Sequence, residues 1–226
     1  MINFEALYKL SYGMYVVSSG DHKSGNAYIS NTVFQVTSNP SQIATCCHKD
    51  NYTIGFIQQT KAFAVSVLHE HSSSDIFKRL GYKSGRDFKK FEGIHVKYGV
   101  SGLPIVLDDA IACFECELVQ SIDLGSHMMF IGQLIHSELL EEASEPMTYA
   151  YYRDVKKAAA PKKAPTYQAY IGPMVEPDTK GPKRYQCLAC DYIYDDAEHD
   201  VLFVDLPYDW ECPDCGSPKS IFVEIQ

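Results

Sequence analysis

Four cysteines in two matched pairs are the residues of this chain with the most defined chemistry. Cys187 and Cys190 stand in RYQCLACDYIYDD, and Cys212 and Cys215 stand in WECPDCGSPKS, with 21 residues between the pairs. Four thiolates at this spacing can close a tetrahedron around one metal ion. The alternative is a pair of disulfides, which a reducing cytoplasm disfavours. The spacing therefore predicts a four-cysteine metal site.

The four sulfurs do not choose the metal, because a tetrahedral S4 set suits zinc or iron. Aromatic residues surround the cysteines in the sequence and predict a small aromatic core built from Tyr185, Tyr192, Tyr194, Phe203, Trp210 and Phe222. Both metals stay open on these grounds alone.

The remaining cysteines are expected to be structural. IACFECELV reads as a strand, and residues three apart in a strand point to opposite faces. Cys113 and Cys116 therefore cannot chelate one ion, despite their CxxC spacing. Cys46 and Cys47 are adjacent and also alternate faces, which favours small strand residues over a redox pair.

A polar stretch near the N-terminal end suits a heterocyclic ligand. GNAYISNTVFQVTSNPSQIATCCHKDNYT mixes Asn, Thr, Ser and Gln with apolar residues, the combination that a cofactor pocket needs. KDNYTIGFI then reads as a helix start, where Asn51 and Thr53 offer polar side chains and a helix N-terminus can bind phosphate. A plain helix cap by Asp50 or Asn51 with no ligand is the alternative reading.

The elements that would position these residues are mainly strands. Runs rich in β-branched and aromatic residues occur in GMYVVSSG, NAYISNTVFQVTS, SQIATCCHK, AFAVSVLHE, IACFECELVQSI and HMMFIGQLIHSELL, with SIDLGSHMM as a hairpin turn. Helices are expected in FEALYKLS, YTIGFIQQT and around SSSDIFKRLGY. Many strands with few helices predict a mainly β fold, a β-barrel with helical caps. No GxGxxG follows a strand, so a Rossmann site is not indicated.

A change of composition divides the chain. Five prolines fall within VKKAAAPKKAPTYQAYIGPMVEPDTKGPKR, and we predict a large domain over residues 1–170, a Pro-rich linker over 171–183 and a small domain over 184–226. So short a domain needs a staple, and the four cysteines supply one. Thirteen linker residues would hold it within roughly 20 Å by coil scaling, at high effective concentration.

Charge and hydropathy limit the partners. The net charge is −9, and residues 184–226 contain two basic and ten acidic residues, so this piece carries nearly all of it. That excess disfavours nucleic acid and suits docking onto a basic patch of a protein. A solvated acidic surface with no partner is the alternative. No apolar run is long enough for a membrane helix and no secretory signal is visible, so a cytoplasmic location with no membrane contact is expected.

The C-terminal piece resembles rubredoxin. YQCLACDYIYD is similar to its first metal knuckle, and FVDLPYDWECPDCGSPKSIF is similar to its second. The resemblance implies one iron held by Cys187, Cys190, Cys212 and Cys215 and the transfer of single electrons. The chain departs from the pattern in a shorter stretch between the pairs and in Asp191, which replaces a glycine of positive φ. Because Asp tolerates the left-handed region, we expect the knuckle to survive.

Residues 1–170 resemble the flavoredoxin and flavin reductase family, through the polar stretch above and through LGYKSGRDFKKFEG, GSHMMFIGQL and PMTYAYY. The resemblance implies an FMN-binding split β-barrel that is usually a homodimer. It places Asn31, Thr32, Val33 and Gln35 along the isoalloxazine ring. It places Thr45, Cys47, Asn51 and Thr53 near the ribityl-phosphate, with Ser84, Gly85 and Arg86 nearby.

One histidine matches a further family motif. His127 falls in the place of a Gly-Asp-His motif that lies close to flavin and nicotinamide, but the middle residue here is Ser126. The residue that would orient His127 is therefore not the usual carboxylate. A purely structural histidine in a hairpin strand is the alternative.

Together the two resemblances predict an NAD(P)H-oxidising reductase of the high-molecular-weight rubredoxin type. Flavin accepts two electrons as hydride and releases them singly to iron, and the family pairing implies a flavodiiron protein as acceptor. One alternative is a flavin reductase that releases free reduced flavin and carries a zinc-bound docking module. Another is a passive electron carrier that another protein reduces.

Overall fold

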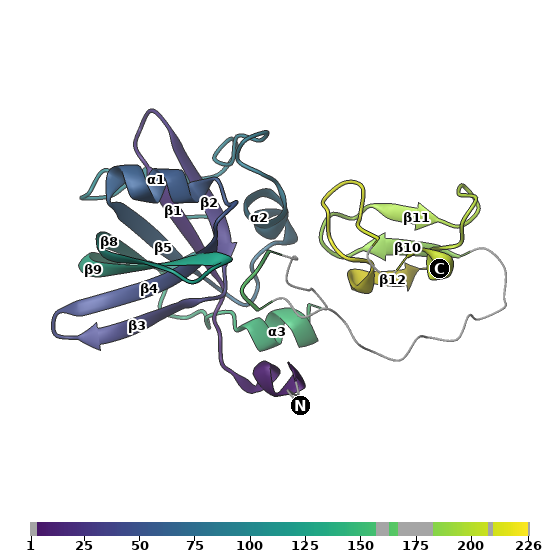
Figure 1. The fold of residues 1–226 in the computed structure, drawn as a ribbon, viewed down its shortest axis with the longest axis horizontal. Coiled ribbons are helices and arrows are strands. Elements are labelled where there is room, and N and C mark those ends of the chain that lie inside the picture. The colour runs from purple at the N-terminus through teal and green to yellow at the C-terminus, as the bar shows by residue number, and fades with distance from the viewer. Residues whose placement is uncertain (1–3, 157–162, 167–182, 208–209, 226) are drawn as a thin grey trace.

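The computed structural model describes residues 4–156, 163–166, 183–207 and 210–225. Strands dominate the larger part, as the sequence predicts, and a smaller part follows it (Figure 1). The larger part contains η1 Phe4–Lys9, β1 Tyr15–Gly20, β2 Gly25–Ser30, β3 Val33–Ser38, β4 Ser41–His48, α1 Thr53–Thr60, β5 Ala62–Leu68, α2 Ser74–Phe77, η2 Lys78–Tyr82, β6 Val96–Tyr98, β7 Pro104–Val106, β8 Ala110–Asp123, β9 His127–Leu139 and α3 Tyr149–Asp154.

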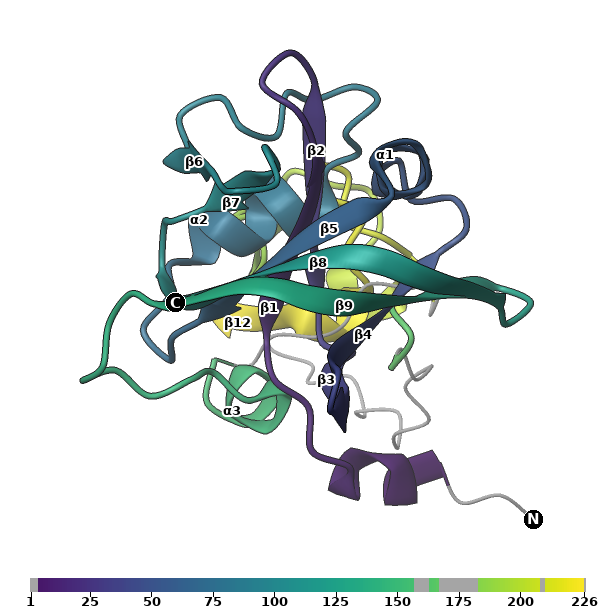
Figure 2. The ribbon, with the colours of Figure 1, turned by 90° about the vertical axis from the view of Figure 1, so that its left-hand side faces the viewer.

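Seven strands form one antiparallel sheet in the order β2-β1-β5-β8-β9-β4-β3. The sheet curls strongly, so that its two ends approach each other (Figure 2). Near the ends, the Tyr28 hydroxyl on β2 lies 3.1 Å from the Thr45 hydroxyl on β4. The barrel is thus closed by side chains between strands that share no backbone ladder, which confirms the predicted split β-barrel.

Strand β1 is buried on both faces, because helices cover the outside of the barrel at this point. Val17 of β1 packs inside the barrel with Phe63, Val65 and Phe130. Its neighbour Val16 points the other way, into the cluster under α2 and α3. This double burial explains why β1 has no polar alternation.

The cysteines outside the two matched pairs lie where alternation predicts. Cys116 belongs to the cluster inside the barrel, and Cys113 to a separate cluster with Leu103 and Ile105. The outer face of β8 is not exposed to solvent at this point, however. Glu115, next to Cys113 on that face, is fully buried because its carboxylate accepts hydrogen bonds from the backbone N–H groups of Val100 and Ser101.

Several elements differ from the sequence expectation. NAYISNTVFQVTS divides into β2 and β3, FEALYKLS forms only a 3-10 helix, and SSSDIFKRLGY forms α2 followed by the π-helical turn η2. The short strands β6 and β7 and the helix α3 were not predicted. Three-residue strands are too short to show a period, and YAYYRD begins its helix through Thr148, whose hydroxyl accepts from the Tyr151 N–H.

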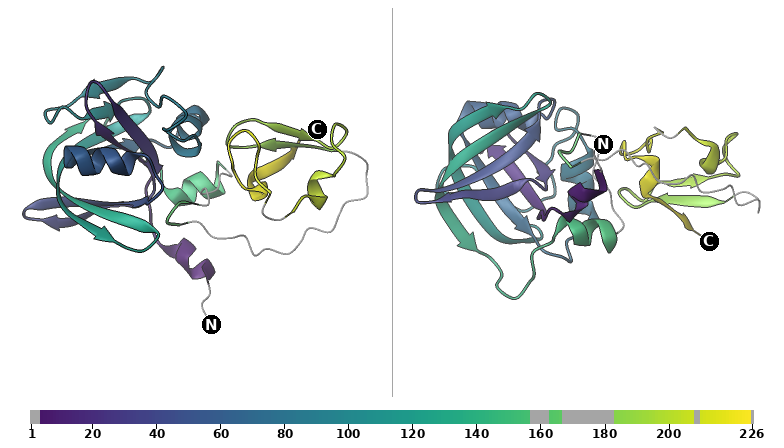
Figure 3. Two further views of the ribbon diagram at one scale, coloured as in Figure 1. Left: turned by 45° about the horizontal axis from the view of Figure 1, so that its top comes forward. Right: turned by 60° about the horizontal axis from the view of Figure 1, so that its bottom comes forward.

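The small part is a three-stranded sheet with an aromatic core. β10 Arg184–Cys187 lies between β11 Ile193–Asp195 and β12 Phe222–Ile225, with 3-10 turns η3 Phe203–Asp205 and η4 Lys219–Ile221. The predicted aromatic core is confirmed: the Tyr185 and Phe203 rings stack at 4.2 Å, and Trp210 meets Phe222 at 5.4 Å. Figure 3 shows the two parts as separate bodies.

Two predictions concern residues outside the described part. The linker at 171–183 lies there except for Lys183, and the predicted domain limits at 170 and 184 stay predictions, although β10 begins at Arg184. Among the described residues, no helix is long and apolar enough to cross a bilayer.

Candidate metal centre and adjoining pocket

The four predicted cysteines meet at one point. Their sulfur atoms all lie within 4.8 Å of one another and all four residues are buried. Cys187 and Cys215 sulfurs are 3.7 Å apart, and Cys190 and Cys212 sulfurs are 3.4 Å apart. Cys187 ends strand β10, Cys212 follows the isolated β-bridge at Glu211, and a tight turn after each brings in the second cysteine of the pair, so that a tetrahedral metal fits.

The two turns are equivalent in backbone geometry. Asp191 N–H donates to the Cys187 carbonyl at 2.9 Å, and Gly216 N–H donates to the Cys212 carbonyl at 2.8 Å. Asp191 has φ 61° and Gly216 has φ 68°. The expectation that Asp191 adopts the left-handed conformation is confirmed. Its carboxylate accepts a 3.2 Å hydrogen bond from the Gln186 side chain, which helps to hold it there.

The thiols need a cation to be ionised together. Hydrogen bonds shared with Cys212 and Cys215 raise the pKa of Cys187, and burial raises the pKa of Cys190. The pKa of Cys215 is instead lowered, because Cys187 and Cys212 hydrogen-bond to it. A bound metal cation favours the thiolate form of all four.

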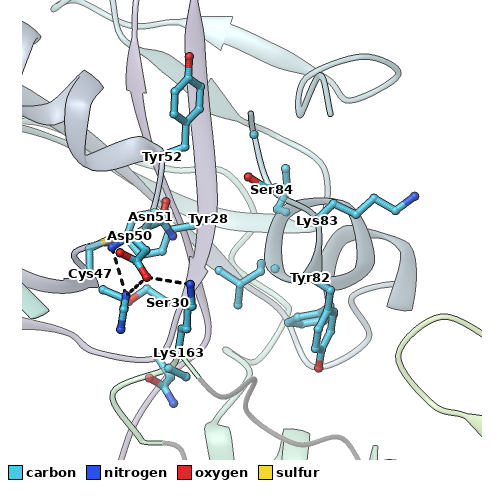
Figure 4. A pocket seen from close by; sticks show the side chains of 18 of the residues that line it. Tyr28, Ser30, Cys47, Asp50, Asn51, Tyr52, Tyr82, Lys83, Ser84 and Lys163 are labelled. Atoms are coloured by element: carbon cyan, nitrogen blue, oxygen red, sulfur yellow. Dashed lines mark hydrogen bonds and ion pairs between the residues drawn. The ribbon is translucent and has the colours of Figure 1, made fainter. Parts of the chain in front are cut away.

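A pocket of about 400 Å³ opens in the larger part, beside the metal centre. This volume lies in the range of small-molecule sites. Six of the predicted flavin-site residues line it: Asn31, Cys47, Asn51, Ser84, Gly85 and Arg86. Figure 4 shows Cys47, Asp50 and Asn51 on one side of the pocket and Tyr82, Lys83 and Ser84 on the other.

Other predicted residues stand behind or beside the pocket walls. Thr45 is buried and bonded to Tyr28, which itself lines the pocket. Thr53 donates a 3.1 Å hydrogen bond to Asn26, another lining residue. Thr32, Val33 and Gln35 are not among the residues that line it, and Gln35 lies on exposed β3.

One end of the pocket is cationic. Asp50 and Tyr52 lie just before α1. Arg86 donates to the Asp50 carbonyl at 3.0 Å, and its guanidinium carbon lies 5.5 Å from the centre of the Tyr52 ring. Lys163 meets the Asp50 carboxylate at 2.8 Å (Figure 4), and this hydrogen bond lowers the pKa of that carboxyl. A helix start with two cationic side chains is an arrangement that binds phosphate.

His127 lies at the same end, next to a histidine that the sequence did not single out. Its ring is 5.0 Å from the ring of His48, which lines the pocket. Ser126 stands where the family motif has an aspartate, and its hydroxyl takes the place of that carboxylate as hydrogen-bond partner of His127, at 2.8 Å from Nδ1. The other ring nitrogen lies 3.2 Å from the Lys163 carbonyl.

The pocket carries signs of a flat polar ligand. Asn31 is 6% exposed, and its side-chain oxygen has no hydrogen-bond partner among the described residues. A Cβ at Gly85 would collide with the Asn26 side chain, so the backbone there must stay bare. Buried Lys90 donates to the Leu80 carbonyl at 2.8 Å, and burial lowers its pKa to about 7. The Gly85 and Lys90 contacts are with protein groups, whereas the orphan Asn31 oxygen fits a flavin, whose ring N–H group could donate to it.

The metal centre forms part of the pocket wall. Glu211, Cys215 and Gly216 of the small part line it together with Tyr82 and Tyr152 of the larger part. Sequence reasoning missed these residues as pocket residues, along with Tyr28, Ser30, His48, Asp50, Tyr52 and Lys163. Most of them lie inside motifs that carried the family resemblance: GNAYISNTVFQVTSNPSQIATCCHKDNYT contains those between positions 28 and 52, LGYKSGRDFKKFEG contains Tyr82, and PMTYAYY contains Tyr152. Lys163 lies in no such motif.

Comparisons with known proteins agree with this architecture. A flavin reductase like domain matches residues 7–159, and a rubredoxin domain matches residues 184–222. The chain is 40% identical to a high molecular weight rubredoxin of Moorella thermoacetica, over 98% of this chain and 99% of that protein. It is 39% identical to a ferric-chelate reductase (NAD(P)H) of Archaeoglobus fulgidus, over 74% of this chain and 98% of that protein.

A solved structure supports the fold of the larger part. The NADH:FAD oxidoreductase of Streptomyces globisporus aligns with a TM-score of 0.57 at 22% identity, over 65% of this chain and 86% of that one. At this identity the likeness shows the fold alone. With the family matches above, the chain belongs to the flavin reductase like domain family and joins that domain to a rubredoxin domain.

Proposed function

We propose that the chain is an NAD(P)H-oxidising electron-transfer flavoprotein, in which FMN in the pocket passes electrons to an iron held by the four cysteines and then to a partner protein. The observation that carries this proposal is the wall shared by the two sites. Cys215 and Gly216 of the metal knuckle line the pocket made by the flavin reductase like domain. An electron leaving the pocket therefore meets a metal ligand directly.

The electron count explains why the two domains are joined. A nicotinamide gives up two electrons as hydride, a flavin accepts both, and a four-cysteine iron accepts one. Each NAD(P)H therefore reduces two ferric ions to ferrous and releases one proton. Because each chain holds one iron, the acceptor protein must reoxidise that iron before it can take the second electron, unless two chains each take one electron.

The pocket residues take the following parts in this proposal. Asn31, with its free acceptor oxygen, holds the edge of the isoalloxazine ring. Thr32, Val33 and Gln35, which follow it in the chain and do not line the pocket, are assigned beside the ring on the family resemblance alone. Thr45, Cys47, Asn51 and Thr53 form the wall toward the ribityl-phosphate, and Ser84, Gly85 and Arg86 close it. His127, oriented by Ser126, stands at the cationic end, where it would contact the nicotinamide.

Names of similar proteins support the donor. The Archaeoglobus fulgidus relative is a ferric-chelate reductase (NAD(P)H), and a flavin reductase solved as a complex with NADP+ has the same fold at a TM-score of 0.55. The donor class proposed here is thus a reduced nicotinamide dinucleotide. Iron is proposed over zinc because residues 184–222 match rubredoxin along with the four cysteines.

The acceptor is proposed to be a flavodiiron protein. Diflavin flavoproteins of Nostoc and Synechocystis contain a segment that is 26% and 22% identical to this chain, over 26% of their length. Because such proteins contain a segment similar to the flavin reductase like domain, a separate flavin reductase chain and a flavodiiron protein are proposed to work as donor and acceptor.

A homodimer is proposed as well, since Phe34 and Val36 of edge strand β3 are 49% and 43% exposed. The cytoplasm is proposed as its location.

An anaerobic visible spectrum tests the proposal. The protein as purified should show both flavin and ferric-thiolate bands, and NADH or NADPH should bleach both with two irons reduced per nicotinamide. The matched control is the same chain loaded with zinc, which keeps the knuckle geometry but carries no electron. It should reduce its flavin as before and fail to reduce the protein acceptor.

Three results would contradict the proposal. A colourless protein with zinc in the four-cysteine site points to a docking module, and iron bands that stay intact with either nicotinamide point to a passive carrier. Equal delivery to the acceptor by the zinc-loaded and iron-loaded chains would remove iron from the path.

A further inference from the structure

A basic segment of the flavin reductase like domain, residues 78–90, faces the acidic metal domain. Residues 78–90 contain six basic residues, of which Lys90 is buried, and one acidic residue, whereas residues 184–226 contain two basic and ten acidic. Helix α2, from which this segment continues, lies on the side of the barrel that faces the small domain (Figure 1). Opposite charge on two tethered domains favours their association.

Lys78 makes a direct contact across this junction. Its ammonium group donates a 3.1 Å hydrogen bond to the carbonyl of Cys190, one of the four metal ligands, in a partly buried position. The bond is charge-assisted, and burial strengthens it relative to a surface pair. Lys78 does not line the pocket, so its role is separate from flavin binding.

Tyr82 makes the second contact from the same turn. Its ring packs against the buried cluster that contains Cys187, Cys190, Cys212 and Cys215, and it also lines the pocket. Its hydroxyl lies 3.2 Å from that of Tyr152, a second lining residue. Lys78 and Tyr82 are four residues apart in a π-helical turn, which places both on one side of it.

We propose that Lys78 and Tyr82 are positioning residues that seat the metal domain on the pocket in a salt-sensitive docked state. Lys78 anchors the first knuckle, and the Tyr82 ring fills the space between the pocket and the sulfurs. Because attraction between opposite charges holds the docked state, the state is reversible, and the acidic metal domain can leave for a basic surface on the acceptor protein. Docking itself needs no electron; only its consequence for iron reduction rests on the proposed function, in which one electron leaves reduced flavin and one ferric ion becomes ferrous.

Fluorescence tests the docking without any turnover. Trp210 is the single tryptophan of the chain and lies in the metal domain. Flavin absorbs where tryptophan emits, so in the zinc-loaded, FMN-loaded chain Trp210 should be quenched while the domain is docked. Raising the salt from about 20 mM to about 500 mM should relieve the quenching, because screening weakens the attraction. Lys78→Ala should show the relieved level already at low salt, and Lys78→Arg should restore the quenching.

Lys89→Ala is the matched control. Lys89 is an exposed lysine of the same basic segment, and the structure gives it no hydrogen bond or ion pair with the described part of the metal domain. Its loss should leave quenching near the wild-type level. If Lys78→Ala stays quenched like wild type, or if Lys89→Ala loses as much quenching as Lys78→Ala, the seat assigned to Lys78 is wrong. Tyr82→Leu should relieve quenching too, and full quenching in that variant would remove Tyr82 from the interface.

Stopped-flow reduction of the iron-loaded chain provides the second readout. Flavin and iron bleach at different wavelengths in one trace, and Lys78→Ala should lower the ratio of the iron rate to the flavin rate by roughly tenfold at low salt, as expected for loss of a charge-assisted hydrogen bond. An unchanged ratio overturns the proposal. If neither centre bleaches in the wild type, the proposed function fails while the fluorescence result still decides on docking.

Discussion

Replacing Asp191 by Gly should raise the reduction potential of the iron centre by about 20 mV without disturbing the first knuckle. Asp191 directly follows the ligand Cys190 and holds φ 61°, the conformation that Gly216 adopts at the second knuckle. A negative charge beside an anionic centre opposes the arrival of an electron. Its removal therefore makes the iron easier to reduce.

The exposure of Asp191 limits the size of this effect. Asp191 is exposed and its carboxylate accepts from the Gln186 side chain, so water screens it. For a separation taken as roughly 8 Å and the dielectric constant of water, Coulomb's law gives on the order of 0.5 kcal/mol for two unit charges, or about 20 mV for a one-electron couple. Relief of the left-handed backbone by Gly, on the order of 1 kcal/mol, is largely offset by the greater freedom of Gly in the unfolded chain. The potential should therefore change while stability hardly does.

Spectroelectrochemical titration of the iron band in the full chain measures this shift. Asp191→Asn is the matched variant, because Asn also tolerates the left-handed region but carries no charge. Asn and Gly should raise the potential equally. A potential that stays put in both variants would refute the charge argument, and a rise in Gly alone would assign the effect to backbone strain.

Three other predictions concern the pocket. The unfolded chain keeps the Lys90 proton up to its ordinary pKa of 10.5, whereas the folded chain loses it near 7; the free energy of unfolding of the flavin-free protein should thus rise with pH between these values, and Lys90→Met should flatten that rise in denaturant titrations. Arg86→Ala should weaken FMN binding by about tenfold and riboflavin binding by less than about twofold, because only FMN has a phosphate to lose; equal losses for both ligands would place Arg86 elsewhere. His127→Ala should raise KM for the nicotinamide by about tenfold with FMN affinity kept, whereas a purely structural His127 would lower stability and leave KM alone.

The metal site was readable from the sequence because its information is local. Each CxxC pair makes its own turn, and the turn geometry depends only on residues within it, such as Asp191 and Gly216. The strands of the barrel were readable for a similar reason, since β-branched runs bounded by turn residues are local patterns. The faces of Cys113 and Cys116 followed from the period of two.

The pocket was only partly readable, because tertiary contacts complete it. Lys163 reaches Asp50 from more than a hundred residues away, and its segment carries no pattern that announces the contact. The burial of Glu115 depends on a loop that folds over β8, which alternation alone cannot show. Tyr82 was visible as part of a motif, but its contact with the cysteines required the position of the second domain.

The pocket has two ends, and this arrangement bears on the order of events. His48 and the Asp50–Lys163 pair occupy one end, whereas Tyr82 lies on the other side of the pocket (Figure 4), packed against the metal cluster. On the proposed function, NAD(P)H contacts the protein at the histidine end while the metal domain rests at the Tyr82 end. The donor and the metal domain then use opposite sides of the pocket, so the metal domain need not undock for each NAD(P)H to bind. Undocking would serve the outside acceptor alone.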